Sequence, residues 1–137
     1  MIRVVLDTNV LVSALLVPGS LPARILRQFR EHRFELVVSG TILEEYGRVL
    51  RRKKFDLSLA SIESILSLIA NGSVLVIPSR HFRIILDDLS DNEFLDVAVE
   101  AKATAIVSGD GHLLSLKSFQ GIPILSPAEF WRKGPSG

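Results

Sequence analysis

The first residues of the chain follow the pattern of a buried strand that ends abruptly at polar side chains. Apolar side chains dominate residues 2–6, and they stop at Asp7, which is followed by two small polar residues. A short run of this kind, rich in β-branched residues, is typical of a buried parallel strand. Asp7 is therefore expected at the carboxyl end of that strand, where open α/β sheets usually bind ligands. An acid at this position either caps a helix or begins a reactive cluster.

Apolar periodicity along the rest of the chain predicts alternating strands and helices. Further strands are expected at residues 34–38, 74–77, 105–107 and 122–125. Helices are expected at residues 10–16, 23–32, 42–54, 57–70, 94–102, 113–116 and 126–131. Residues 79–90 are expected to form a loop with a short extended piece at 84–86.

This alternation of strands and helices indicates βαβ units. We predict a three-layer α/β/α sandwich around a mainly parallel sheet of four or five strands. A single domain is expected over residues 1–133, with a loose tail over 134–137.

The composition excludes some kinds of functional site but does not identify a function. The chain has 137 residues, of which 47% are hydrophobic and 23% charged, and its formal net charge is +1. A global field that attracts nucleic acid is therefore not expected, and such binding would need a local basic patch. The chain contains no Cys, which excludes disulfides and thiol-based sites. With no signal-peptide pattern and no apolar run of membrane-spanning length, a soluble, cytoplasmic protein without a membrane partner is expected.

Helical phase separates two neighbouring acids of the helix expected at 42–54. If Tyr46 marks the centre of its apolar face, Glu45 lies about 100° away and Glu44 about 160° away. Glu45 can then lean over the edge of the sheet, whereas Glu44 points outward. Pairing of Glu45 with a nearby arginine is the alternative interpretation.

The helix expected at 94–102 begins with an acid on its core-facing side. Asp91 falls on the same face as the apolar residues Phe94, Leu95, Ala98 and Ala101. The remaining acids of this segment are expected to point away from the core; they are Glu93, Asp96 and Glu100. Ser90 and Glu93 have the spacing of a capping box, which leaves Asp91 without a capping role. Burial of an unbound acid is costly, so Asp91 either binds something or interacts with the helix dipole.

Asp110 repeats the pattern of Asp7, because it follows an apolar strand and small polar residues and precedes a helix. Taken alone, it could be the N-cap of that helix. Together, four acids at one edge would repel each other unless a cation neutralised them. Oxygen ligands suit Mg²⁺ or Mn²⁺, and zinc is poorly supported in a chain with no Cys and three His. Carboxylates that hold such ions are typical of phosphodiester hydrolysis.

Four segments, in this order, resemble PIN domains, the nuclease fold of many toxins of toxin–antitoxin systems. They are LDTNV at 6–10, SGTILEEYGRVL at 39–50, DNEFLDVAVEAKA at 91–103 and VSGDGHLL at 107–114. The resemblance is to a branch of toxin-like PIN proteins more than to the shorter VapC-type toxins. The family's four metal-binding acids match Asp7, Glu45, Asp91 and Asp110. Asn9 matches a polar residue that supports the first acid, and Ser108 stands where the family more often has Thr.

The resemblance implies a metal-dependent endoribonuclease that leaves a 5′-phosphate and a 3′-hydroxyl. It also implies a homodimer or higher homo-oligomer and a small antitoxin protein that blocks the site. Basic residues in and after the Glu45 helix could hold the RNA backbone; they are Arg48, Arg51, Arg52, Lys53 and Lys54. Their alternative role is that of a solvated helix face.

Two other function classes remain to be compared with the nuclease. The first is a PIN-like module that binds RNA or protein without cleavage. The second is a receiver-like phosphoryl-transfer domain, which also clusters acids at a sheet edge. A receiver would need a lysine after a late strand, and residues 122–125 are followed by Ser126-Pro127 instead.

Overall fold

The computed structural model describes residues 1–134 of the chain, so residues 135–137 of the expected tail lie outside the described part. One six-stranded sheet runs through the molecule, in the order β3-β2-β1-β4-β6-β5. Its strands are β1 (Arg3–Leu6), β2 (Glu35–Val38), β3 (Val74–Leu75), β4 (Ala105–Val107), β5 (Ser118–Phe119) and β6 (Ile122–Leu125). All neighbouring strands pair in parallel except β5 and β6, which are antiparallel. The predicted α/β fold with a mainly parallel sheet is confirmed.

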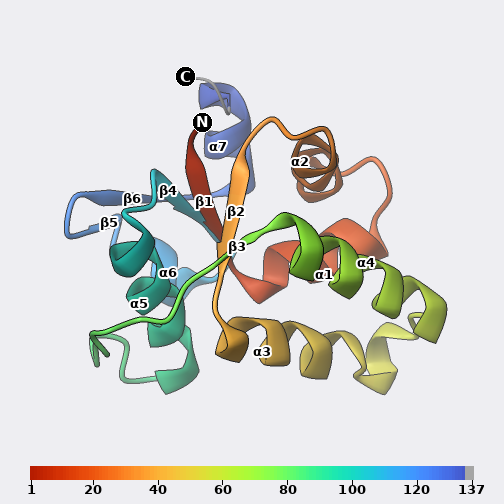
Figure 1. Ribbon diagram of the computed structural model, residues 1–137, viewed down its shortest axis with the longest axis horizontal. Coiled ribbons are helices and arrows are strands. Elements are labelled where there is room, and N and C mark those ends of the chain that lie inside the picture. The colour runs from red at the N-terminus through yellow and green to blue at the C-terminus, as the bar shows by residue number, and fades with distance from the viewer. Residues whose placement is uncertain (135–137) are drawn as a thin grey trace.

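The helices cover both faces of this sheet (Figure 1). They are α1 (Thr8–Leu16), α2 (Leu21–Arg30), α3 (Gly40–Leu50), α4 (Leu59–Gly72), α5 (Asn92–Ala101), α6 (Gly111–Leu114) and α7 (Pro127–Lys133). Two short 3-10 helices, η1 (Lys53–Phe55) and η2 (Leu89–Asp91), complete the described elements. Helix α5 packs against β1 and β2 and lies across the sheet from α1 and α2.

The order of the strands reverses at β1. From β1 the chain moves outward to β2 and β3, and it then returns to the other side of β1 with β4 and β6. The carboxyl ends of β1 and β4 are therefore adjacent at the topological switch point, which is the usual ligand site of open α/β sheets. Asp7 follows β1 directly, and Ser108 follows β4.

The buried strands anchor the core. Val4 and Val5 of β1 have no exposed surface, and Leu36 to Val38 of β2 are equally enclosed. Strands covered on both faces require continuous apolar runs, which is the pattern found in the sequence. Serine caps then fix where the helices begin: Ser39 accepts a hydrogen bond from Ile42 N at 3.1 Å and starts α3.

All the predicted helices and strands are present, apart from the short extended piece in the loop before α5. Their ends shift by several residues, and the helix expected at 42–54 divides into α3 and η1. The extended piece expected at 84–86 is not a strand. The sheet also contains β5, which the sequence pattern does not indicate. Strands β5 and β6 are joined at Gln120 and Gly121, both with positive φ, as in the tight turns that match the twist of a hairpin.

Within residues 1–134, no single helix combines the length and the apolar character needed to cross a membrane. The successive helices α1 and α2 meet that test only as a pair, and they are bent by 100° at the break between them.

Candidate metal and nuclease site

Ser108 joins the two acids that follow neighbouring strands. Its hydroxyl donates to Asp7 Oδ2 at 2.7 Å and accepts from the backbone N–H of Asp110 at 2.9 Å. Because β1 and β4 pair side by side, this single side chain orients both acids toward one edge of the sheet. Asp7 is buried to 97%, with a relative exposure of 3%. The structure thus places Asp7, Ser108 and Asp110 in one hydrogen-bonded group, as the strand-end pattern predicts.

Glu45 approaches the same edge from α3. Thr8, the residue after Asp7, donates its hydroxyl to Glu45 Oε2, and Arg48 Nη2 lies 3.8 Å from Glu45 Oε1. The Glu45 side chain is 15% exposed, whereas Glu44 is exposed to solvent. Helical phase therefore distinguishes these two acids correctly. The arginine pair that the sequence offers as an alternative is also present, so it accompanies the inward orientation of Glu45.

Asn9 does not contribute a hydrogen bond to the cluster. Its side chain is exposed, and no side-chain hydrogen bond from it occurs within residues 1–134. The hydrogen bonds that orient the acids come instead from Ser108 and Thr8. The sequence pattern does not indicate this role of Thr8, because Thr8 stands at the start of a helix, where a polar residue is usual.

Asp91 is the least satisfied of the acids. Its side chain is 6% exposed, and its Oδ2 atom is buried without a hydrogen-bond partner. A buried carboxylate oxygen with no partner is rare and costly, so it calls for a ligand that the described residues do not provide. One carboxylate oxygen of Asp91, one of Asp110 and a ring nitrogen of His112 all lie within 4.8 Å of one another.

The pKa values reflect this crowding of carboxylates. Burial, followed by the charges of Asp110 and Glu45, raises the pKa of Asp7 from 3.8 to about 6 against the opposing hydrogen bond from Ser108. Burial and the neighbouring Asp110 raise the pKa of Asp91 to about 8. Burial would also raise the pKa of Asp110, but hydrogen bonds from Asp91 and from the N–H of His112 hold it below its usual value. A divalent cation would relieve these shifts, and an all-oxygen set of acids fits Mg²⁺ or Mn²⁺.

The N-terminus of α5 differs from the predicted capping box. Asp88, not Ser90, caps the preceding turn, because its Oδ1 accepts from the backbone N–H and the hydroxyl of Ser90. Glu93 accepts from the hydroxyl of Ser39 at 2.7 Å instead of reaching back to the cap. The turn η2 moves the helix start to Asn92, so the Ser90–Glu93 spacing no longer spans a helix terminus. Asp91 nonetheless makes no side-chain capping bond, as expected.

Asn92 holds the loop that precedes Asp91. Its Oδ1 accepts from the N–H groups of Ile84 and Ile85, each at 2.9 Å, and its Nδ2 donates to the carbonyls of Ile85 and Leu89. All four hydrogen-bonding capacities of this buried amide are used. The loop from residue 84 to Leu89 is therefore fixed to the helix that carries Asp91.

Asp96 points inward, which corrects the expectation that it faces solvent. It is 4% exposed, accepts from Phe82 N at 2.8 Å and lies 3.2 Å from His81 Nδ1. The apolar periodicity of α5 could not reveal this, because the partner is an irregular loop and not the sheet.

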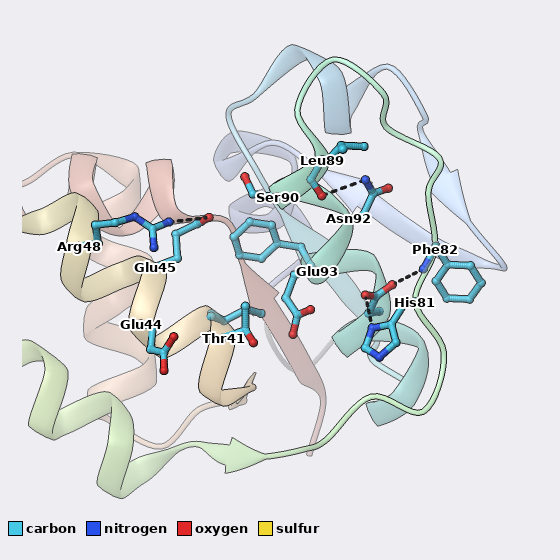
Figure 2. Close-up of a pocket in the computed structure, with 13 residues that line it drawn as sticks. Thr41, Glu44, Glu45, Arg48, His81, Phe82, Leu89, Ser90, Asn92 and Glu93 are labelled. Atoms are coloured by element: carbon cyan, nitrogen blue, oxygen red, sulfur yellow. Dashed lines mark hydrogen bonds and ion pairs between the residues drawn. The ribbon is translucent and has the colours of Figure 1, made fainter.

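A cavity of about 320 Å³ lies between α3 and α5, next to the acid cluster (Figure 2). Thr41, Glu44, Glu45 and Arg48 line it from α3, and Glu93 and Asp96 line it from α5. His81 and Phe82 border it from the loop. His81, Glu93 and Asp96 form a second group of close ligand atoms, which is distinct from the acids at the strand ends.

The basic residues occupy two kinds of position. Arg48 lines the cavity and pairs with Glu45. The others follow the end of α3 and are exposed; they are Arg51, Arg52, Lys53 and Lys54.

Comparison with known proteins places the chain in context. The model of the family described as PIN domain matches residues 3–112. The chain is 37% identical over 119 residues to uncharacterized protein MJ1680 of Methanocaldococcus jannaschii, and the match spans 85% of this chain and 76% of that protein. A chain in the solved structure of FitAB bound to an IR36 DNA fragment has a similar fold. The two chains have 17% sequence identity and a TM-score of 0.56, and the match covers 93% of this chain and 96% of the other.

Proposed function

The chain belongs to the PIN domain family, a nuclease superfamily, and on this premise we propose that it is a metal-dependent endoribonuclease. The proposed ion is Mg²⁺ or Mn²⁺, and its proposed ligands are Asp7, Glu45, Asp91 and Asp110. We propose the same residues as catalytic, within a single nuclease domain over residues 1–133. The observation that carries the proposal is the buried Asp91 Oδ2, which has no hydrogen-bond partner in the described part of the chain.

The chain's own side chains have distinct proposed tasks in this site. Ser108 holds the Asp7 carboxylate and the backbone of Asp110 in a fixed relation. Thr8 and Arg48 hold one oxygen each of Glu45, which leaves the carboxylate facing the strand ends. When bound, the divalent ion would supply Lewis-acid charge to polarise a phosphodiester and to activate water.

The proposed substrate and partners are those that the resemblance to PIN domain toxins implies. We propose RNA as the substrate, with its backbone held by Arg48, Arg51, Arg52, Lys53 and Lys54. We further propose that the protein is the toxin of a toxin–antitoxin pair, assembles as a homodimer or higher homo-oligomer, and is blocked by a small antitoxin protein. The likeness in fold to FitAB, which was solved bound to a DNA fragment, supports a partnership of this kind.

The test of the proposal is RNA cleavage by the purified protein with MgCl₂ or MnCl₂, followed by mapping of the fragment ends. Wild type is expected to leave 5′-phosphates. Asp7→Asn and Glu45→Gln are expected to abolish cleavage while they keep the wild-type circular dichroism spectrum. Glu63→Gln is the control, because it removes an exposed carboxylate from α4, outside the lining of the cavity, and it should cleave as wild type does.

Cleavage by Asp7→Asn at the wild-type rate would show that the site is assigned wrongly. Metal-independent binding of RNA without any cleavage by wild type would instead favour a binding module. Calorimetric titration with MnCl₂ distinguishes these outcomes, since a module without a metal site should bind no Mn²⁺ at millimolar concentration.

A further inference from the structure

His112 lies next to the acid cluster, at the start of α6. Its Nδ1 atom is 3.7 Å from Asp110 Oδ1, and its Nε2 atom is 3.7 Å from Asp87 Oδ2. Its side chain is about half exposed, at 49%, so the ring is accessible from solvent. The imidazole thus stands between the proposed metal ligand Asp110 and an acid of the preceding loop.

These distances fit a shared ion better than a direct hydrogen bond. A separation of 3.7 Å is too long for an N–H···O hydrogen bond. Metal–ligand bonds of about 2.0–2.2 Å place two donors of one ion up to about 4.4 Å apart. Donor atoms of Asp91, Asp110 and His112 lie within 4.8 Å of one another, which requires only small movements to close around an ion.

A second observation in the same group indicates a missing ligand. Asp91 is 6% exposed, and its buried Oδ2 atom has no hydrogen-bond partner among residues 1–134. Because Asp91 belongs to the cluster that contains His112, the carboxylate with the unpartnered oxygen and the imidazole ring lie in the same group of close ligand atoms. A cation at this place would satisfy both.

Asp87 completes a pattern that is common at metal sites. A histidine that ligates a metal through one ring nitrogen usually directs its other nitrogen to a carboxylate, which fixes the orientation of the ring. Asp87 Oδ2 lies 3.7 Å from His112 Nε2, the ring nitrogen opposite the Nδ1–Asp110 contact. This separation is also too long for a hydrogen bond, but the Asp87 side chain is 82% exposed and needs only a small rotation to accept from Nε2 once an ion fixes the ring. Asp87 lies on the loop that Asn92 fixes to α5, so this carboxylate is carried by an anchored segment.

We propose that His112 is a fifth ligand of the metal site, oriented by Asp87, and that it gives the site a preference for Mn²⁺ over Mg²⁺. The inference rests on the proposed function, because it adds a nitrogen ligand to the proposed carboxylate site. Imidazole suits transition-metal ions, whereas Mg²⁺ takes oxygen ligands almost exclusively. Removal of the imidazole should therefore weaken Mn²⁺ binding and leave Mg²⁺ binding nearly unchanged.

The experiment combines calorimetric titration of MnCl₂ and MgCl₂ with pulsed electron paramagnetic resonance of bound Mn²⁺. A directly ligating imidazole nitrogen couples its nuclear spin to Mn²⁺, which gives a signature independent of catalysis. The wild-type protein is expected to show this nitrogen coupling, and His112→Gln is expected to lose it. The substitution should also weaken Mn²⁺ binding by about tenfold or more, since loss of even an outer partner of a ligand typically costs ~10–100-fold.

Two controls make the outcomes distinguishable. His81→Gln removes the other histidine that lies beside a carboxylate near the cavity, and it should keep the nitrogen coupling. Asp7→Asn tests whether the bound ion occupies the proposed carboxylate site. Mn²⁺ binding that needs Asp7 but shows no nitrogen coupling would overturn the role of His112 and leave the proposed function standing.

Two further results would also overturn the inference. Coupling that survives His112→Gln and disappears in His81→Gln would assign the ion to the group of His81, Glu93 and Asp96. No binding of either ion that depends on Asp7 would overturn the inference and the proposed metal site together.

Discussion

Replacement of Asp7 by Asn should stabilise the protein in the absence of metal, and the gain should grow with pH. The pKa of Asp7 is about 6 in the folded protein, against 3.8 in its ordinary state. The folded protein therefore holds this proton more tightly than the unfolded chain does. The stability that Asp7 contributes is fully present below pH 3.8 and is lost as the pH rises through about 6.

The size of this stability difference follows from the rise in the pKa of Asp7 from 3.8 to about 6. Each unit corresponds to about 1.4 kcal/mol, so ionisation of Asp7 costs the folded protein about 3 kcal/mol at pH 8 and about 0.5 kcal/mol at pH 4. Asn carries no charge and can still accept the hydrogen bond that Ser108 donates to Asp7 Oδ2. Asp7→Asn should therefore be more stable than wild type by up to about 3 kcal/mol at pH 8, with little difference at pH 4.

The assay is urea unfolding followed by circular dichroism, in EDTA, at several pH values from 4 to 8. Comparison of variant and wild type at the same pH removes the contributions of acids that do not interact with Asp7, such as Glu100 and Glu129, whose pKa values are lowered. The neighbouring Asp91 adds to the expected gain, because the charge of Asp7 raises the pKa of Asp91 in the wild type. Glu44→Gln, an exposed change, should stay within about 0.5 kcal/mol of wild type at every pH. A difference between Asp7→Asn and wild type that does not vary with pH would refute the reasoning, as would a less stable variant at pH 8.

Three further predictions concern the surroundings of the site. Asn92→Ala should lower the free energy of unfolding by about 2–4 kcal/mol, because it leaves the N–H groups of Ile84 and Ile85 unpaired. NMR hydrogen exchange should show faster exchange of these two amides, and exchange at the wild-type rate would contradict the prediction. Ser108→Ala should raise the pKa of Asp7 above about 6, because the lost hydrogen bond lowers that pKa; a carboxyl NMR titration with an unchanged or lower value would show otherwise. In an Asp7→Asn background, the double substitution Arg51→Ala/Arg52→Ala should weaken RNA binding and reduce its salt dependence, as measured by fluorescence anisotropy at several salt concentrations. Arg33→Ala is the control, because Arg33 precedes β2 at the opposite edge of the sheet, and it should change neither property.

The sequence predicts the acids whose positions depend on regular elements. Asp7 and Asp110 each follow an apolar strand whose end is clear in the sequence, and the parallel pairing of β1 and β4 brings those ends together. The fixed phase of a helix distinguishes Glu45 from Glu44. The family match over residues 3–112 confirms the fold and family that the four motifs indicate.

Other parts of the site depend on loops, where apolar residues do not recur at the regular spacing that identifies helices and strands. Asp96 is buried by the loop that carries Phe82 and His81, and the start of α5 is moved by the turn that Asp88 caps. His112 has Asp110 as a neighbour in sequence, but its second carboxylate neighbour, Asp87, comes from the loop before α5. Such contacts are set by the tertiary structure, so neither composition nor periodicity could supply them.

Both margins of the sheet have a consequence for how copies of this protein can associate. The outermost strands, β3 and β5, are only two residues long. Pro78, which lacks an N–H group, follows shortly after β3. Short or proline-flanked margins leave little free backbone for a strand from another molecule, which is how natural proteins resist edge-to-edge aggregation. A homo-oligomer of this chain would therefore have to form through its helices and loops, and the sheets of the copies would not join into one continuous sheet.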